Sequence, residues 1–200
     1  IRGSTDCGKS ISVTRPSQAA PFPTGIAQSH AGLGPMAIAA RGDGSVLVSG
    51  GAGRNQLFEF GPGGGEAGDS LVDLPYPVFD LEFDAAGRLW ATTGGGPLLH
   101  LDADTGAIVA EFGDGLTQSL AIHPESGQIY VTSGGGVEVF DPLTGSFSRF
   151  SNLRVGNLRF APDGTLGAAS WPERGTIVRF DDQGRPEAML RLETPVDSIA

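Results

Sequence analysis

Short segments in which apolar and polar positions alternate recur along this chain. In residues 79–83, Leu81 and its odd-numbered neighbours share one face, while Asp80 and Glu82 share the other. A period of two is typical of a half-buried β-strand. The recurring segments are also rich in Gly, Pro and β-branched residues, which disfavour helix interiors. The pattern therefore predicts an all-β chain.

Four imperfect copies of one longer pattern occupy most of the sequence. Each copy has a short apolar strand, a turn ending in Gly, a second strand, a Gly-rich loop and a third strand ending in Phe or Leu. The turn glycines are 43, 40 and 37 residues apart, at Gly44, Gly87, Gly127 and Gly164. A period near 40 with four short strands per unit is typical of a β-propeller blade. We therefore predict a β-propeller of four-stranded antiparallel blades, with about four blades visible.

The copies also predict where the blades begin and end. Residues 195–200 repeat the opening of the fourth copy, and residues 9–16 resemble the third strand of a blade with its turn. We expect an incomplete part of a larger propeller, with further blades supplied by the same longer chain. The expected units are the end of a preceding blade plus a connecting segment at 1–33, blades at about 34–74, 75–115, 116–153 and 154–194, and the start of the next blade at 195–200.

An arc that does not close would leave sheet faces without a neighbouring blade. Such faces would expose apolar side chains, which on a soluble protein mark missing partners or association. At the two ends of the arc we expect these faces to be built from Ile38, Val46 and Val48, or from Leu158 and Phe160.

Composition and charge narrow the range of partners. The formal net charge is −10, with Lys9 as the only lysine beside twelve arginines. A chain of this charge repels phosphate backbones and acidic membrane surfaces, so we expect neither nucleic acid nor membrane insertion. Cys7 is the only cysteine, so no disulfide within the chain is expected. The thirty-two glycines recur at turns between apolar strands and are interpreted as structural.

Residues 129–145, which read IYVTSGGGVEVFDPLTG, resemble the repeats of YVTN-type β-propellers. The resemblance covers roughly residues 34–200 and extends more loosely to NHL repeats and to the gluconolactonase-like group. Residues 101–112 are similar to the quinoprotein-type blade motif, with Ala110 where that pattern prefers tryptophan. The resemblance implies a blade architecture, often in secreted or cell-envelope proteins of bacteria, and it transfers no catalytic residue.

In gluconolactonase-like enzymes a metal is held by carboxylate and asparagine side chains near the channel ends of the inner strands. The matching positions here are Ala37, Asp80, Ser119, Asn157 and Ser198. Of these, only Asp80 and Asn157 could be ligands of a divalent metal such as Ca²⁺. Apart from this resemblance, the sequence indicates no cofactor.

Polar residues on inner strands are costly to bury unless they are paired or face water or a ligand. Asp80 and Glu82 project from one face of the second copy's first strand, and Asn157 and Arg159 hold the equivalent positions two copies later. We expect these four residues either to line a wet channel or to form a polar or metal-assisted binding site at one channel mouth. Trp171 lies in a loop, where its indole either caps the core or belongs to a recognition surface.

Residues 3–10 match the phosphate-binding pattern G-x-x-x-x-G-K-S letter for letter. A functional phosphate loop needs a buried strand before it and a helix after it. Here only two residues precede Gly3, and β-branched residues and Pro16 follow the motif. We interpret the segment as a polar loop.

Two classes of function remain. The first is a non-enzymatic propeller module that provides a rigid platform for a protein or carbohydrate partner within a larger secreted or cell-envelope protein. The second is a metal-assisted small-molecule hydrolase or lyase of the gluconolactonase-like type. The sequence favours the first, because the inner-strand positions lack a full set of acidic ligands.

Overall fold

The computed structural model describes residues 22–196 and residue 199, and this part of the chain consists of strands, turns and loops. The predicted all-β class with four-stranded antiparallel units is confirmed. Across the described ranges, no helix is long and apolar enough to cross a membrane. Residues 3–10 and 9–16, for which a polar loop and a blade strand were predicted, lie outside the described residues.

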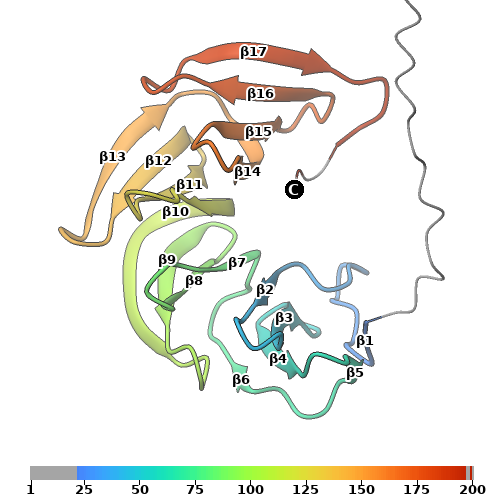
Figure 1. The fold of residues 1–200 in the computed structure, drawn as a ribbon. Helices are drawn as coiled ribbons and strands as arrows, with labels where there is room; N and C mark the ends of the chain where they lie inside the picture. Colours follow the sequence, from blue (N-terminus) through green and yellow to red (C-terminus); the bar gives the residue numbers. More distant parts are fainter. Residues whose placement is uncertain (1–21, 197–198, 200) are drawn as a thin grey trace, which may run out of the picture.

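Four units, here called blades 1 to 4, follow one another along the chain (Figure 1). Blade 1 contains β2 (Ile38–Ala40), β3 (Val46–Gly50), β4 (Gln56–Phe60) and β6 (Val72–Asp73). Blade 2 contains β7 (Asp80–Phe83), β8 (Leu89–Thr92), β9 (Gly96–Leu101) and the first part of β10 (Ile108–Ile122). Blade 3 contains the last part of β10, β11 (Ile129–Ser133), β12 (Gly136–Asp141) and β13 (Ser146–Ser151). Blade 4 contains β14 (Val155–Phe160), β15 (Leu166–Ser170), β16 (Thr176–Phe180) and β17 (Pro186–Arg191).

Strand β10 joins two blades in one continuous strand of 15 residues. Its first part, from Ile108 to Leu116, pairs with β9, and its last part, from Leu116 to Ile122, pairs with β11. The pairing register shifts between Phe112 and Leu116, where Gly113 and Gly115 have φ angles of +65° and +70°. Glycine adopts these angles without a Cβ clash, so the strand can turn from the outer edge of blade 2 to the inner edge of blade 3.

The turn glycines of the four copies have the conformation that the pattern requires. Their φ angles are +85°, +78°, +69° and +80° at Gly44, Gly87, Gly127 and Gly164. Each of these residues ends the turn between the first and second strands of its blade. The short hairpins therefore place β2, β7, the end of β10 and β14 nearest the centre of the arc, and β6, β13 and β17 at its periphery (Figure 1).

The hydrophobic core is divided among the contacts between blades. Leu57 of blade 1 packs in one cluster with Leu99 of blade 2. Trp90 of blade 2 shares a cluster with Phe140 of blade 3, and their ring centroids are 5.7 Å apart. A third cluster joins blades 3 and 4 and includes Val137, Leu158 and Val178. Packing between successive blades therefore holds the arc together.

The expectation of exposed apolar faces at both ends of the arc is wrong for most of the residues named. Val46 and Val48 are buried, and they share a cluster with Phe58 and Phe60 against which Ile26 and Ala67 pack. Leu158 is also buried and Phe160 is partly buried, whereas Ile38 is 59% exposed.

The segment before blade 1 explains much of this burial. Its strand β1 (Pro23–Thr24) pairs in parallel with β5 (Gly65–Glu66), and this pairing holds the segment against blade 1. Ile26 lies so close to Gly50 that a Cβ on that glycine would meet the Ile26 side chain at 2.3 Å. The sequence pattern did not predict that residues before the first copy cover its sheet.

Candidate functional site

Asp80 begins the inner strand of blade 2, and its carboxylate accepts three hydrogen bonds from the protein. The backbone N–H of Leu81 donates to Oδ1 at 3.0 Å. The Ser119 hydroxyl and the Leu120 backbone N–H, both from the inner strand of blade 3, donate to Oδ2 at 2.8 and 3.0 Å. The carboxylate therefore connects two adjacent blades at the centre of the arc.

The same connection recurs one blade later. The backbone N–H of Leu158 in β14 donates to Ser119 Oγ at 3.1 Å, and the side-chain amide of Asn157 approaches the same oxygen at 3.5 Å. Asn157 Oδ1 in turn accepts a bond of 3.0 Å from the backbone N–H of Ile199. Each of these polar side chains thus binds a backbone N–H that lies about 40 residues further along the chain, at Leu120, Leu158 and Ile199.

We call Asp80, Ser119 and Asn157, with the bonds just described, the inter-blade relay. These residues hold three of the five positions at which the gluconolactonase-like resemblance implies metal ligands. Their oxygens point to protein N–H and O–H groups, so a cation would have to displace bonds that join the blades. The described residues contain no group of three or more His, Cys, Asp or Glu side chains arranged to hold a metal ion.

Burial changes the protonation of both carboxyls on β7. Desolvation raises the pKa of Asp80, and the hydrogen bonds from Leu120 and Ser119 offset only part of that effect. Desolvation also raises the pKa of Glu82 from 4.5 to about 7, against the positive charge of Arg159, which lowers it. The Glu82 carboxyl therefore changes between its protonated and ionised forms near neutral pH.

The predicted four-residue group separates into two pairs. Glu82 Oε1 lies 4.0 Å from Arg159 Nη1, and the two side chains are 28% and 56% exposed. Glu82 lines a cavity together with the turn after β7, and Arg159 lines another beside Ile199. Asp80 and Asn157 instead line a third cleft, which Trp171 also lines.

This third cleft has a volume of about 560 Å³ and lies where the inner strands β7 and β14 begin, beside the blade 3 part of β10. We call it the channel-mouth cleft. Its wall includes loops that join second and third strands in blades 1 and 4. The lining residues are Leu33, Met36, Arg54, Phe79, Asp80, Gln118, Ser119, Gly156, Asn157, Ser170, Trp171, Arg174 and Val196.

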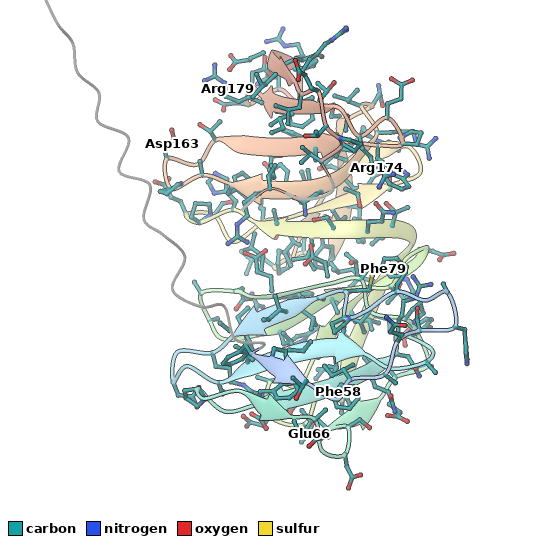
Figure 2. The ribbon with its side chains drawn as sticks, turned by 90° about the vertical axis from the view of Figure 1, so that its right-hand side faces the viewer. Phe58, Glu66, Phe79, Asp163, Arg174 and Arg179 are labelled. Atoms are coloured by element: carbon teal, nitrogen blue, oxygen red, sulfur yellow. The ribbon has the colours of Figure 1, made fainter. Side chains whose placement is uncertain are left out.

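Two arginines at the channel-mouth cleft stack on aromatic rings. The Arg54 guanidinium carbon lies 4.7 Å from the centroid of the Phe79 ring, and that of Arg174 lies 5.8 Å from the centroid of the Trp171 ring. The Trp171 side chain is 38% exposed. In Figure 2, Phe79 and Arg174 lie toward the right-hand side of the view. The cleft thus presents flat apolar surfaces beside hydrogen-bond donors, an arrangement typical of ligand sites.

Sequence reasoning named Asp80, Asn157 and Trp171 but missed the two arginines and Phe79. Arg54 and Arg174 lie in loops between second and third strands, and of these two loops only Trp171 was considered for recognition. Aligning the loops of the four copies would have placed both arginines on the same side of the blades. Ser198, the fifth aligned position, lies outside the described residues.

No family model matches the sequence, and no curated protein matches it. Among solved structures, the chain is similar to selenomethionine-substituted virginiamycin B lyase from Staphylococcus aureus, with a TM-score of 0.62 and 18% sequence identity. That alignment covers 81% of this chain and 57% of the lyase. A streptogramin B lyase structure gives a TM-score of 0.59 and 19% identity, over 80% of this chain and 55% of the lyase.

The chain therefore spans little more than half the length of these lyases. Structural similarity at sequence identities below 20% shows a shared fold, but it does not show that substrate or active-site residues are shared. Both lyases are β-propeller proteins, and the described strands are arranged in the same way. The chain has a β-propeller-type fold.

Proposed function

We propose that the chain is a non-enzymatic binding module that recognises its ligand at the channel-mouth cleft. One observation carries this proposal: Asp80, Ser119 and Asn157 of the inner strands are engaged in the inter-blade relay, while the open cleft beside them is lined by residues that include Arg54, Phe79, Trp171 and Arg174. The centre of the arc thus provides rigidity, and the loops around it provide recognition groups.

The context of this module follows from the repeat resemblance and is part of the same proposal. YVTN- and NHL-type blades describe an architecture that serves unrelated functions, which fits a platform better than it fits a particular reaction. We place the module in a larger secreted or cell-envelope protein, where further blades of the same chain would continue the arc. Its partner would be a carbohydrate or a protein segment.

Trp171 allows a direct test of binding, because its indole lies at the cleft whereas Trp90 is buried between blades 2 and 3. Intrinsic fluorescence would be titrated with small sugars, amino acids, short peptides and aromatic acids. We expect a saturable change with at least one of these classes, and we expect Trp171→Ala to abolish it. Leu143→Ala is the matched control, because Leu143 is 92% exposed and does not line the cleft. Absence of a saturable response in every class would contradict the proposal.

A second candidate is a small-molecule lyase or hydrolase, and two observations favour it. The fold is similar to those of virginiamycin B lyase and streptogramin B lyase, and Glu82 has a pKa of about 7, which suits a general acid or base. Loss of intact virginiamycin B or of gluconolactone would be followed by mass spectrometry with and without added Ca²⁺ or Mg²⁺. Turnover that disappears in Glu82→Gln would replace the binding-module proposal by this one.

A further inference from the structure

The lining of the channel-mouth cleft differs in charge from the chain as a whole. Arg54 and Arg174 line the cleft, and Arg154 lines a small adjoining pocket of about 60 Å³ that shares Trp171 with it. Among the described residues that line these two pockets, Asp80 is the only acidic one, although the formal net charge of the chain is −10. Basic groups gathered in a concave site concentrate anions there.

The side chains of Arg54 and Arg154 form no ion pair with any described residue. Among the other described arginines outside the cleft, six are each paired with a carboxylate, and Arg191 is not. These paired arginines are Arg41, Arg88, Arg149, Arg159, Arg179 and Arg185. The donors of Arg54 and Arg154 are therefore available to an anion from solution.

The backbone fixes the position of Arg54. Its φ angle of +58° lies in the left-handed region, which costs a non-glycine residue about 1–2 kcal/mol. The Arg54 N–H donates to the Gly51 carbonyl at 3.0 Å, and the Arg54 carbonyl accepts a bond of 2.7 Å from Val78 N–H. These bonds hold the conformation in which the guanidinium stacks on Phe79. A stacked guanidinium keeps the N–H groups at its edge free to bind both oxygens of a carboxylate.

The remaining lining fits a flat ligand better than a spherical ion. Phe79 and Trp171 supply ring surfaces, and the side-chain amides of Gln118 and Asn157 supply polar groups. Asp80 would oppose an anion if it were fully charged. Burial raises the pKa of Asp80, and its oxygens accept bonds from the protein, so this opposition is reduced.

We propose that the channel-mouth cleft binds a small planar carboxylate, whose negative group pairs with Arg54 and whose aromatic part lies against Phe79 and Trp171. Arg154 adds to the positive field that attracts it. This inference rests on the proposed binding function and adds the charge and shape of the ligand to it.

The test compares three small probes of nearly equal size by ¹⁹F NMR titration of the full chain: 4-fluorobenzoate, 4-fluorobenzamide and 4-fluorobenzylammonium. Fragments of this size bind at about millimolar concentrations when they bind a single site. We expect the benzoate to bind at least tenfold more tightly than the amide and the ammonium compound to bind most weakly. Unlabelled glucuronate should displace the benzoate only weakly, because it has the carboxylate on a non-planar sugar ring and has no aromatic ring.

Substitutions then locate the bound anion. Arg54→Gln should weaken benzoate binding about tenfold, which corresponds to about 1.4 kcal/mol, and leave binding of the amide unchanged. Arg154→Gln should weaken it less, and raising the salt concentration should remove most of that smaller effect. Arg179→Gln is the matched control, because Arg179 lies toward the opposite side of the molecule from Arg174 (Figure 2).

Each of three results would overturn the planar-anion proposal. Equal binding of benzoate and amide would remove the charge preference while leaving a ligand-binding cleft, so the proposed binding function would stand. Preferential benzoate binding that survives Arg54→Gln would place the anion elsewhere. Undetectable binding of all three probes would reject the planar ligand, and the fluorescence titration against Trp171 would still decide the binding function separately.

Discussion

Because the pKa of Glu82 is raised in the folded protein, we expect the protein to lose stability as the pH rises toward neutrality. The Glu82 pKa is raised from 4.5 to about 7 in the folded state, mainly by burial. Between these two values the folded chain binds more protons at this site than the unfolded chain. The free energy of unfolding is therefore unaffected by this group below about pH 4.5, falls as the pH rises to about 7, and levels off above that value.

The size of the effect follows from the pKa shift. At 1.36 kcal/mol per pH unit, a move from 4.5 to about 7 corresponds to at most about 3 kcal/mol. Glu82 is 28% exposed and lies 4.0 Å from a mostly solvated Arg159, so water penetration and screening reduce this figure. We expect a measured contribution of about 1–3 kcal/mol, a large fraction of the stability of a domain.

Urea unfolding at pH 4.5, 6 and 8 would measure this contribution in the native chain and in Glu82→Gln. The native chain should lose about 1–3 kcal/mol more than the variant between the lowest and highest pH. Glu66→Gln is the control, because Glu66 is exposed on β5 of blade 1 and does not line the cavity of Glu82, so it should leave the native pH dependence unchanged. Identical pH dependence of the native chain and Glu82→Gln would refute the assignment.

The pair with Arg159 provides an independent check of the sign. The positive charge of Arg159 lowers the pKa of Glu82, so removing it should raise that pKa above 7. Carbon-13 NMR of the Glu82 carboxyl in Arg159→Gln would show the change directly. A lower pKa in that variant would contradict the stabilisation of the Glu82 carboxylate by the Arg159 charge.

Three further predictions concern the relay, the core and metal binding. Ser119→Ala removes the hydroxyl that joins Asp80 to blade 4, so we expect the free energy of unfolding, measured in urea, to fall by about 1–3 kcal/mol. The control Leu143→Ala changes an exposed side chain and should alter the free energy of unfolding by less than about 0.5 kcal/mol. Trp90→Ala should cost about 3–5 kcal/mol in the same assay, because Trp90 is 2% exposed and packs between two blades, and a loss below about 1 kcal/mol would contradict that packing. Calorimetric titration with Ca²⁺ should give no heat that depends on Asp80 and Asn157, whose oxygens already accept protein bonds, and saturable heat lost in the Asp80→Ala/Asn157→Ala double variant would show that a cation displaces those bonds.

The fold could be predicted because its signals are local. Period-two alternation and a turn glycine in each copy, such as Gly87 with its φ of +78°, fix the hairpins irrespective of their surroundings. The site could be predicted only in part. Alternation places Asp80 and Glu82 on one face, but two residues along a strand are about 6–7 Å apart. That distance is enough for the two carboxylates to line different cavities.

Hydrogen bonds between blades were beyond sequence reasoning because they depend on how one blade sits against the next. Asp80 and Asn157 are residue types that commonly bind metals, so the sequence allowed a metal site there. Their roles in the relay depend on the positions of the Leu120 and Ile199 N–H groups, which only the structure shows. The cover over blade 1 was missed for a related reason. Ile26 belongs to no repeat, so its contact with the sheet has no counterpart in the other copies.

Loop length explains why the recognition groups gather at blades 1 and 4. The loops between the second and third strands span residues 93–95 in blade 2 and 134–135 in blade 3, but 51–55 in blade 1 and 171–175 in blade 4. Only the two longer loops have room for a large side chain beyond the turn itself, and they carry Arg54 in one case and Trp171 with Arg174 in the other. Both line the same cleft across the arc. We therefore expect that shortening either loop to the length in blade 3 would remove the proposed ligand recognition while leaving the relay and the inter-blade core in place.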